Sequence, residues 1–254
     1  MPKNHDTLQE LKSYAKQLRL AYIHKNIKEL IEEADVKEQG IAGFLCNILS
    51  RECDQRMENG KIDRIRLANF PYKKYLEDLR IESLPEDARR KLKQLETLDF
   101  IKSGQNVILA GNPGTGKTHI AIGLGIKACM NGYKVLFTTI PQLINKLKEH
   151  RATRTLLQLE RQFERYDLII ADELGYISFD KEGGELLFSL LSLRAERKST
   201  IITTNLSFER WEEIFKDPIM TAAMVDRLTH KSYIVSMNGN SYRLKETEDW
   251  LKNQ

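Results

Sequence analysis

The sequence predicts an α/β fold with a five-stranded parallel sheet covered by helices on both faces, preceded by a small all-helical module. From Val107 onward, short runs rich in β-branched residues alternate with helical stretches, a pattern typical of a parallel sheet buried on both faces. Before that point, apolar residues recur at helical spacing, as in Ile27, Leu30 and Ile31. A chain of 254 residues can hold one large domain and such a module.

The order of patterns along the chain sets the expected boundaries. Pro71 and Pro85 break the helical pattern, so we expect the helical module at 1–66 and the α/β domain at 67–254. Five short apolar runs predict the strands, at 107–110, 134–140, 167–173, 199–205 and 233–238.

Composition restricts the class of protein only moderately. Lys and Arg outnumber Asp and Glu by 40 to 36, and this net charge of +4 permits a nucleic-acid partner without requiring one. No apolar run approaches the roughly 20 residues of a membrane span, so we expect a cytoplasmic protein with no membrane partner. Three cysteines are too few and scattered for a disulfide framework or a zinc site, and the spacing of Cys46 and Cys53 predicts one shared buried face.

A phosphate-binding motif follows the first predicted strand. The stretch GNPGTGKT fits the pattern G-x-x-x-x-G-K-[ST], in which glycines turn backbone N–H groups toward phosphates at a helix N-terminus. Lys117 is expected to reach the β- and γ-phosphates of ATP, and Thr118 to offer its hydroxyl to Mg²⁺. The residues expected to contact the nucleotide are Gly111, Asn112, Pro113, Gly114, Thr115, Gly116, Lys117, Thr118 and His119.

Two adjacent carboxylates end the third predicted strand. Asp172 follows the apolar run LIIA and is expected to hold Mg²⁺ together with Thr118. Glu173 is placed to polarise a water against the γ-phosphate, which favours an ATPase over phosphoryl transfer to a metabolite. Asn205 ends the fourth strand, where it could reach between the γ-phosphate and that water. The alternative for Asn205 alone is an ordinary turn residue.

These motifs together resemble the DnaC/IstB branch of the AAA+ ATPases over about residues 70–243, with the closer match to IstB-like transposition helpers. The stretches that carry the resemblance are NFPYKKYLEDL, GNPGTGKTHIAIGLG, YDLIIADELGY, STIITTN, AAMVDRLTH and NSYR. The resemblance implies the strand order 5-1-4-3-2, with Asn205 on the strand between the first and the third. It makes Arg227 a candidate arginine finger acting on a neighbouring subunit, and Arg243 a candidate sensor-II arginine.

The sequence departs from the usual AAA+ pattern at its C-terminal end. Only about a dozen residues follow NSYR, so the helical lid is expected to be missing or vestigial. Arg243 therefore lacks the platform that usually carries a sensor-II arginine. For Arg227, spacing alone equally allows an ordinary surface pair with Asp226.

Basic residues gather in two places that could contact DNA. The segment 146–165 carries six Lys or Arg against three Glu, and RAERK follows at 194–198. Such rows neutralise phosphates without reading sequence, although a solvated helix face is the alternative. The candidate DNA contacts are Lys146, Lys148, Arg151, Arg154, Arg194 and Lys198.

The sequence therefore predicts an ATPase that assembles into a homo-oligomer on double-stranded DNA, with ATP at the subunit interfaces. The resemblance implies delivery of target DNA to an IstA-like transposase, with the helical module contacting DNA, the partner or other copies. Two alternatives stay open: a replicative helicase loader that prefers single strands, and a nucleotide-gated binding module with little turnover.

Overall fold

The computed structural model describes residues 3–37, 40–176 and 178–252, which divide into two compact units, 1–63 and 64–254. The predicted boundary at 66/67 lies in the same helix as this division. No described helix is both long enough and apolar enough to cross a membrane. The helices of the first unit are α1 (Lys3–Gln17), α2 (Ala21–Val36) and the first part of α3 (Ile41–Leu67).

The first unit is held by a small apolar cluster and one buried carboxylate. Residues of all three helices, including Ala15, Ile27 and Ile48, form the cluster. Glu52 of α3 is 3% exposed and accepts hydrogen bonds from the backbone N–H groups of Tyr22 and Ile23 at 2.9 and 3.1 Å. Since those N–H groups open α2, which has no side-chain cap of its own, Glu52 supplies its cap from a distant part of the chain.

The predicted buried face containing Cys46 and Cys53 is wrong, because both thiols are exposed. Leu45 and Leu49 are also about half exposed, so only part of the apolar side of α3 packs within this unit.

The second unit contains the predicted parallel sheet, in the order β2-β3-β4-β1-β5. Read from the other edge this is 5-1-4-3-2, so the predicted order is confirmed. β4 lies between β1 and β3, as expected for the strand before Asn205. The strands are β1 (Val107–Ala110), β2 (Val135–Thr139), β3 (Leu168–Leu174), β4 (Ser199–Thr204) and β5 (Tyr233–Ser236).

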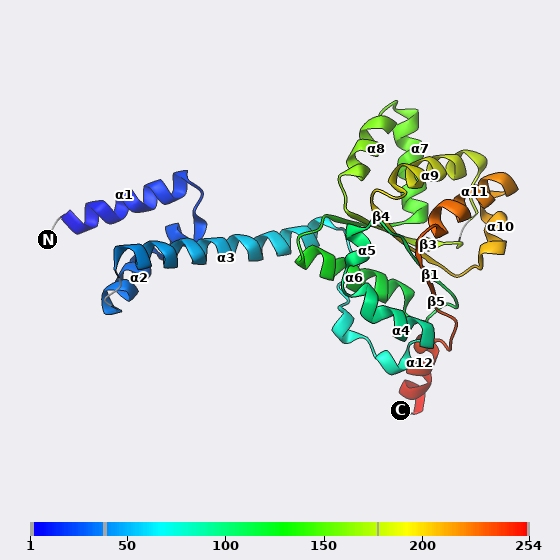
Figure 1. The fold of residues 1–254 in the computed structure, drawn as a ribbon, viewed down its shortest axis with the longest axis horizontal. Coiled ribbons are helices and arrows are strands. Elements are labelled where there is room, and N and C mark those ends of the chain that lie inside the picture. The colour runs from blue at the N-terminus through cyan, green and yellow to red at the C-terminus, as the bar shows by residue number, and fades with distance from the viewer. Residues whose placement is uncertain (1–2, 38–39, 177, 253–254) are drawn as a thin grey trace. The chain divides into compact units, whose positions relative to one another are not determined.

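Helices cover both faces of the sheet (Figure 1). Alternate strand residues point to opposite faces, so Leu109 and Ile170 join one core cluster while Ile108 and Ile169 join the other. The first face carries α4 (Glu86–Leu95), α5 (Asp99–Lys102) and α6 (Lys117–Met130), and the short helices η1 (Leu76–Asp78) and η2 (Ile81–Ser83) precede them. The second face carries α7 (Ile140–Ala152), α8 (Leu156–Glu164), α9 (Lys181–Arg194), η3 (Phe208–Trp211), α10 (Glu212–Phe215) and α11 (Pro218–Thr229).

One helix, α12 (Tyr242–Lys252), follows the last strand. It is the only described helix after β5. Its first residues include Arg243, which makes its position relative to the phosphate-binding loop important for the site.

Candidate functional site

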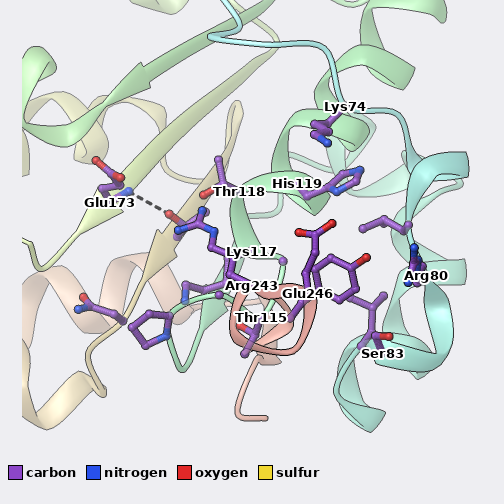
Figure 2. A pocket seen from close by; sticks show the side chains of 18 of the residues that line it. Lys74, Arg80, Ser83, Thr115, Lys117, Thr118, His119, Glu173, Arg243 and Glu246 are labelled. Carbon is purple, nitrogen blue, oxygen red and sulfur yellow. Dashed lines mark hydrogen bonds between the residues drawn. The ribbon is translucent and has the colours of Figure 1, made fainter. Parts of the chain in front are cut away.

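A cavity of about 330 Å³ lies at the carboxyl ends of the strands (Figure 2). Ligands of parallel α/β sheets bind at this edge, where loops from several strands meet. The wall of this carboxyl-edge cavity includes residues from the loop after β1 and from the ends of β3 and β4. It also includes residues from 72–84 and from α12.

The loop after β1 needs glycine at two positions because other parts of the chain lie against it. A Cβ on Gly111 would lie 2.3 Å from the carbonyl carbon of Met237, and one on Gly114 would lie 2.1 Å from Ser241 Oγ. Both glycines also have positive φ, at +152° and +78°. A side chain at either position would therefore push the loop away from the segment that follows β5.

That segment is tied to the loop by hydrogen bonds. The backbone N–H of Tyr242 donates to Gly114 O at 2.9 Å, and Asn112 Nδ2 donates to Gly239 O at 3.2 Å. Because Tyr242 opens α12, the helix begins directly on the loop, and Arg243 lines the cavity (Figure 2). α12 thus brings Arg243 to the cavity, although the usual platform of a sensor-II arginine was expected to be missing.

Lys117 opens α6 at the cavity wall. Its Nζ donates to the carbonyl oxygens of Gly111 and Asn112, both at 2.7 Å. Burial lowers the pKa of its ammonium to about 8, with Asp172 acting in the opposite direction and Arg243 adding to the decrease. The site therefore holds a cation at a net energetic cost, and an anion in the cavity would relieve that cost.

Asp172 and Thr118 face each other beside this lysine. Thr118 Oγ1 lies 3.1 and 3.2 Å from the two carboxylate oxygens of Asp172, and Thr203 Oγ1 donates to Oδ1 at 2.5 Å. Burial raises the pKa of the Asp172 carboxyl, while the hydrogen bonds from Thr203 and Thr118 lower it.

These oxygen ligands fit Mg²⁺, which takes one or two protein ligands and completes its shell with phosphates and water. No group of three or more His, Cys, Asp or Glu side chains suited to a metal occurs among the described residues. A magnesium ion held with a nucleotide needs no such group, so Thr118 and Asp172 are the residues that would hold it.

Glu173 is turned out of the strand into the cavity. Its φ is +68°, in the left-handed region that a non-glycine residue rarely adopts. The pairing of β3 with β4 shifts register between Ala171 and Leu174, and this bulge directs the exposed Glu173 side chain toward the cavity. Asp172 and Glu173 thus lie in different surroundings although they are neighbours in sequence, because Asp172 is buried and Glu173 is exposed to solvent.

The two remaining predicted catalytic residues, Asn205 and Arg227, lie in different places: one is in the cavity wall and the other is outside it. Asn205 lines the cavity, and its Oδ1 is buried without a hydrogen-bond partner among the described residues. Arg227 of α11 is exposed, is not part of the cavity wall, and stacks over the Phe188 ring at 4.9 Å from its centroid.

Sequence reasoning missed the segment 72–84 and the residue Thr203. Tyr72, Lys74, Arg80 and Ser83 all line the cavity (Figure 2 labels the last three), and the Arg80 guanidinium lies 5.5 Å from the centroid of the Tyr242 ring. The aromatic and basic cluster in NFPYKKY was a signal for this segment.

Four of the predicted DNA contacts come from α7 and the turn after it, and we call them the basic α7 surface: Lys146, Lys148, Arg151 and Arg154. Lys146 lies toward α8, with its Nζ 6.0 Å from the centroid of the Phe163 ring. Two of them already have acidic partners at the start of α9. Lys148 pairs with Asp180 at 2.6 Å and Arg151 with Glu182 at 3.4 Å. Arg154 is exposed and forms no ion pair with any described residue.

The prediction that Arg194 contacts DNA is wrong. Its side chain is 1% exposed, and its guanidinium donates to the carbonyl oxygens of Phe163, Tyr166 and Ser199 at 2.6, 3.1 and 2.9 Å. Arg194 therefore holds α8, α9 and β4 together from inside. Lys198 is partly exposed and pairs with Asp167 at 2.6 Å.

The chain matches the family described as IstB-like ATP binding protein over residues 13–249. It belongs to this family. An IS21 protein of Pseudomonas aeruginosa, named for ATP binding, is 36% identical over 239 residues, which cover 94% of this chain and 90% of the relative. Its counterpart from IS5376 of Geobacillus stearothermophilus is 32% identical, and the match covers 94% of this chain and 95% of that relative.

Solved structures agree with this family at the level of fold. A DnaC helicase loader matches with a TM-score of 0.53 and 18% identity, covering 72% of this chain and 98% of the loader. The replication initiator DnaA bound to AMPPCP and single-stranded DNA gives a TM-score of 0.56 at 18% identity. The match covers 70% of this chain and 54% of the DnaA chain. The α/β unit of this IstB-like chain therefore has the P-loop AAA+ fold that was predicted.

Proposed function

We propose that this IstB-like chain binds ATP with Mg²⁺ in the carboxyl-edge cavity and hydrolyses it. The observation that supports this most is the meeting of α6 with the end of β3: Lys117, Thr118 and Glu173 line the cavity, and the buried Asp172 accepts a hydrogen bond from Thr118. Lys117 and the loop N–H groups bind the β- and γ-phosphates, and Thr118 with Asp172 holds the metal. Bound Mg²⁺ supplies charge neutralisation to the phosphates.

Glu173 is the proposed general base. Its carboxylate is exposed to the cavity and can accept a proton from a water that attacks the γ-phosphate. Asn205 orients that water, and Arg243 adds positive charge on the phosphate side. These roles account for why one carboxylate is buried with hydroxyl partners while its neighbour is open.

Phosphate release and nucleotide affinity test this proposal together. Lys117→Ala should abolish ATP binding, because it removes a charge-assisted hydrogen bond to phosphate. Glu173→Gln should bind ATP as the unmodified chain does, yet slow phosphate release by about 100-fold or more. Near-normal turnover in Glu173→Gln would eliminate the assigned role.

We further propose that ATP at subunit interfaces drives assembly on duplex DNA, and that the assembly delivers this DNA to an IstA-like transposase. The insertion-sequence names of the relatives support the transposition role over that of a helicase loader. The basic α7 surface contacts the DNA backbone, and the helical module at 1–66 contacts DNA, the transposase or other copies.

Arg227 is the proposed finger that completes the site of a neighbouring copy, since it lies outside its own cavity wall. Arg227→Ala should bind ATP but hydrolyse it poorly. Mixing it with Lys117→Ala should restore part of the activity, because some interfaces join an intact arginine to an intact loop. No recovery at any ratio, with co-assembly verified by sizing, would refute a shared site.

A further inference from the structure

The strands β3 and β4 do not match residue for residue beside the cavity. Ala171 pairs with Ile202, and the next pair is Leu174 with Thr204. Two residues of β3, Asp172 and Glu173, therefore oppose the single residue Thr203 of β4. A bulge of this kind leaves one backbone group outside the regular ladder and re-aims the side chain beside it.

The side chain of Thr203 takes over the missing ladder hydrogen bond. Its Oγ1 accepts a hydrogen bond from the backbone N–H of Glu173 at 2.9 Å, drawn as the dashed line at Glu173 in Figure 2. The same Oγ1 donates its hydrogen to Asp172 Oδ1 at 2.5 Å. A hydroxyl has one hydrogen and two lone pairs, so it can serve an N–H group and a carboxylate at once.

Burial makes this hydroxyl hard to replace. Thr203 is 2% exposed and Asp172 is 3% exposed, so water has little access to either group. Without the hydroxyl, the Glu173 N–H would lose its acceptor on β4, and the buried Asp172 carboxylate would keep only Thr118 of its two hydroxyl donors. The left-handed φ of Glu173 is unfavourable for a glutamate, so it persists only while its surroundings hold it.

We propose that Thr203 is a positioning residue for the hydrolytic reaction, whose single hydroxyl sets the orientation of both carboxylates. Through the N–H group it holds the Glu173 backbone in the conformation that sends the carboxylate into the cavity. Through Oδ1 it fixes the Asp172 carboxylate toward Thr118. This inference rests on the proposed hydrolysis of ATP at this site.

Steady-state phosphate release by the full chain tests the proposal with Thr203→Val, which keeps the shape and removes the hydroxyl. We expect kcat to fall by about 10- to 100-fold, since small displacements of reacting groups have effects of that size. KM for ATP should stay within about threefold, because Lys117 and the loop are unchanged. Thr203→Ser restores the hydroxyl and should bring kcat back to within about threefold.

Thr200→Val is the matched control, since Thr200 is equally buried on the same strand and lies outside the cavity wall. It should leave kcat unchanged. If Thr203→Val does not fold, Thr203→Cys, whose thiol is a weak donor and acceptor, should show the same decrease in kcat.

The Glu173→Gln chain separates failure of this inference from failure of the proposed function. A Thr203→Val chain with full kcat, beside an inactive Glu173→Gln chain, overturns the role of Thr203 alone. Equal decreases in kcat for Thr203→Val and Thr203→Ser, or a change in KM without one in kcat, overturn it as well. Normal turnover in Glu173→Gln would instead remove the proposed function on which the inference rests.

Discussion

The carboxyl-edge cavity and the basic α7 surface differ in what holds their polar side chains. In the cavity, Asp172 is bonded to hydroxyls from α6 and β4, and the bulge beside it sets Glu173. On the basic α7 surface, Lys148 and Arg151 have exposed acidic partners, and Arg154 is free of ion pairs with described residues. The proposed chemistry at the first place depends on fixed geometry, whereas the proposed binding of DNA phosphates at the second depends mainly on charge.

Replacing the buried Arg194 should give the largest effect of these substitutions, a decrease in the free energy of unfolding. Arg194 also shows that a basic residue in a charged stretch of sequence need not lie on the surface. Arg194→Met should reduce the free energy of unfolding by about 3 kcal/mol or more, since it removes three hydrogen bonds from a charged donor, at roughly 1.5–3 kcal/mol each. Lys198→Met, four residues on, removes a partly exposed ion pair and should cost at most about 1 kcal/mol. Urea unfolding of both chains measures this, and equal decreases in stability would contradict the structural role of Arg194.

Charge reversal on the basic α7 surface should affect DNA and spare the cavity. Arg151→Glu with Arg154→Glu should weaken DNA binding by about 10-fold or more. The slope of log affinity against log salt should become shallower by about one for each DNA phosphate that is no longer neutralised. Affinity for ATP should not change, because neither residue lines the cavity. Unaltered DNA affinity in this double variant would leave that surface without its proposed role.

Titration of Lys117 should have a smaller effect, a decrease in ATP affinity as the pH rises. In the free protein its pKa is lowered to about 8 by burial, so its charge is lost as pH rises above about 8. Bound phosphates favour the charged form, and binding should take up a proton between about pH 8 and the ordinary lysine pKa near 10.4. ATP affinity should therefore fall above about pH 8, by at most about tenfold per pH unit.

Calorimetric titration at about pH 8.5, in two buffers of different ionisation enthalpy, measures this proton uptake, since the pH lies just above the lowered lysine pKa. Lys117→Arg retains a charge at all these pH values and should bind without taking up a proton. An affinity that stays constant from about pH 7 to about pH 9.5 in the unmodified chain would show that Lys117 is not the titrating group.

Sequence patterns predicted the parts of the molecule whose chemistry is local. The phosphate loop, Asp172 and Glu173 are contiguous motifs at strand ends, and the resemblance added the strand order. Thr203 could not be identified because its role arises from a bulge that pairs it with two residues of another strand. Arg194 was misjudged because two of its three acceptors, the carbonyl oxygens of Phe163 and Tyr166, lie 31 and 28 residues earlier in the chain. Cys46 and Cys53 were misplaced because helical periodicity does not say how much of an apolar face finds a partner.

We propose that nucleotide in the carboxyl-edge cavity controls binding of duplex DNA. In this proposal each copy offers few phosphate contacts, so assembly multiplies them, and ATP at the interfaces controls assembly. Fluorescence anisotropy of labelled duplex and single strands, with a slow ATP analogue, ADP or no nucleotide across a salt series, measures this directly. We expect tight, strongly salt-dependent binding with the analogue only, and duplex preferred over single strand. A single-strand preference would favour a helicase loader, and equally strong binding without nucleotide would contradict the claim.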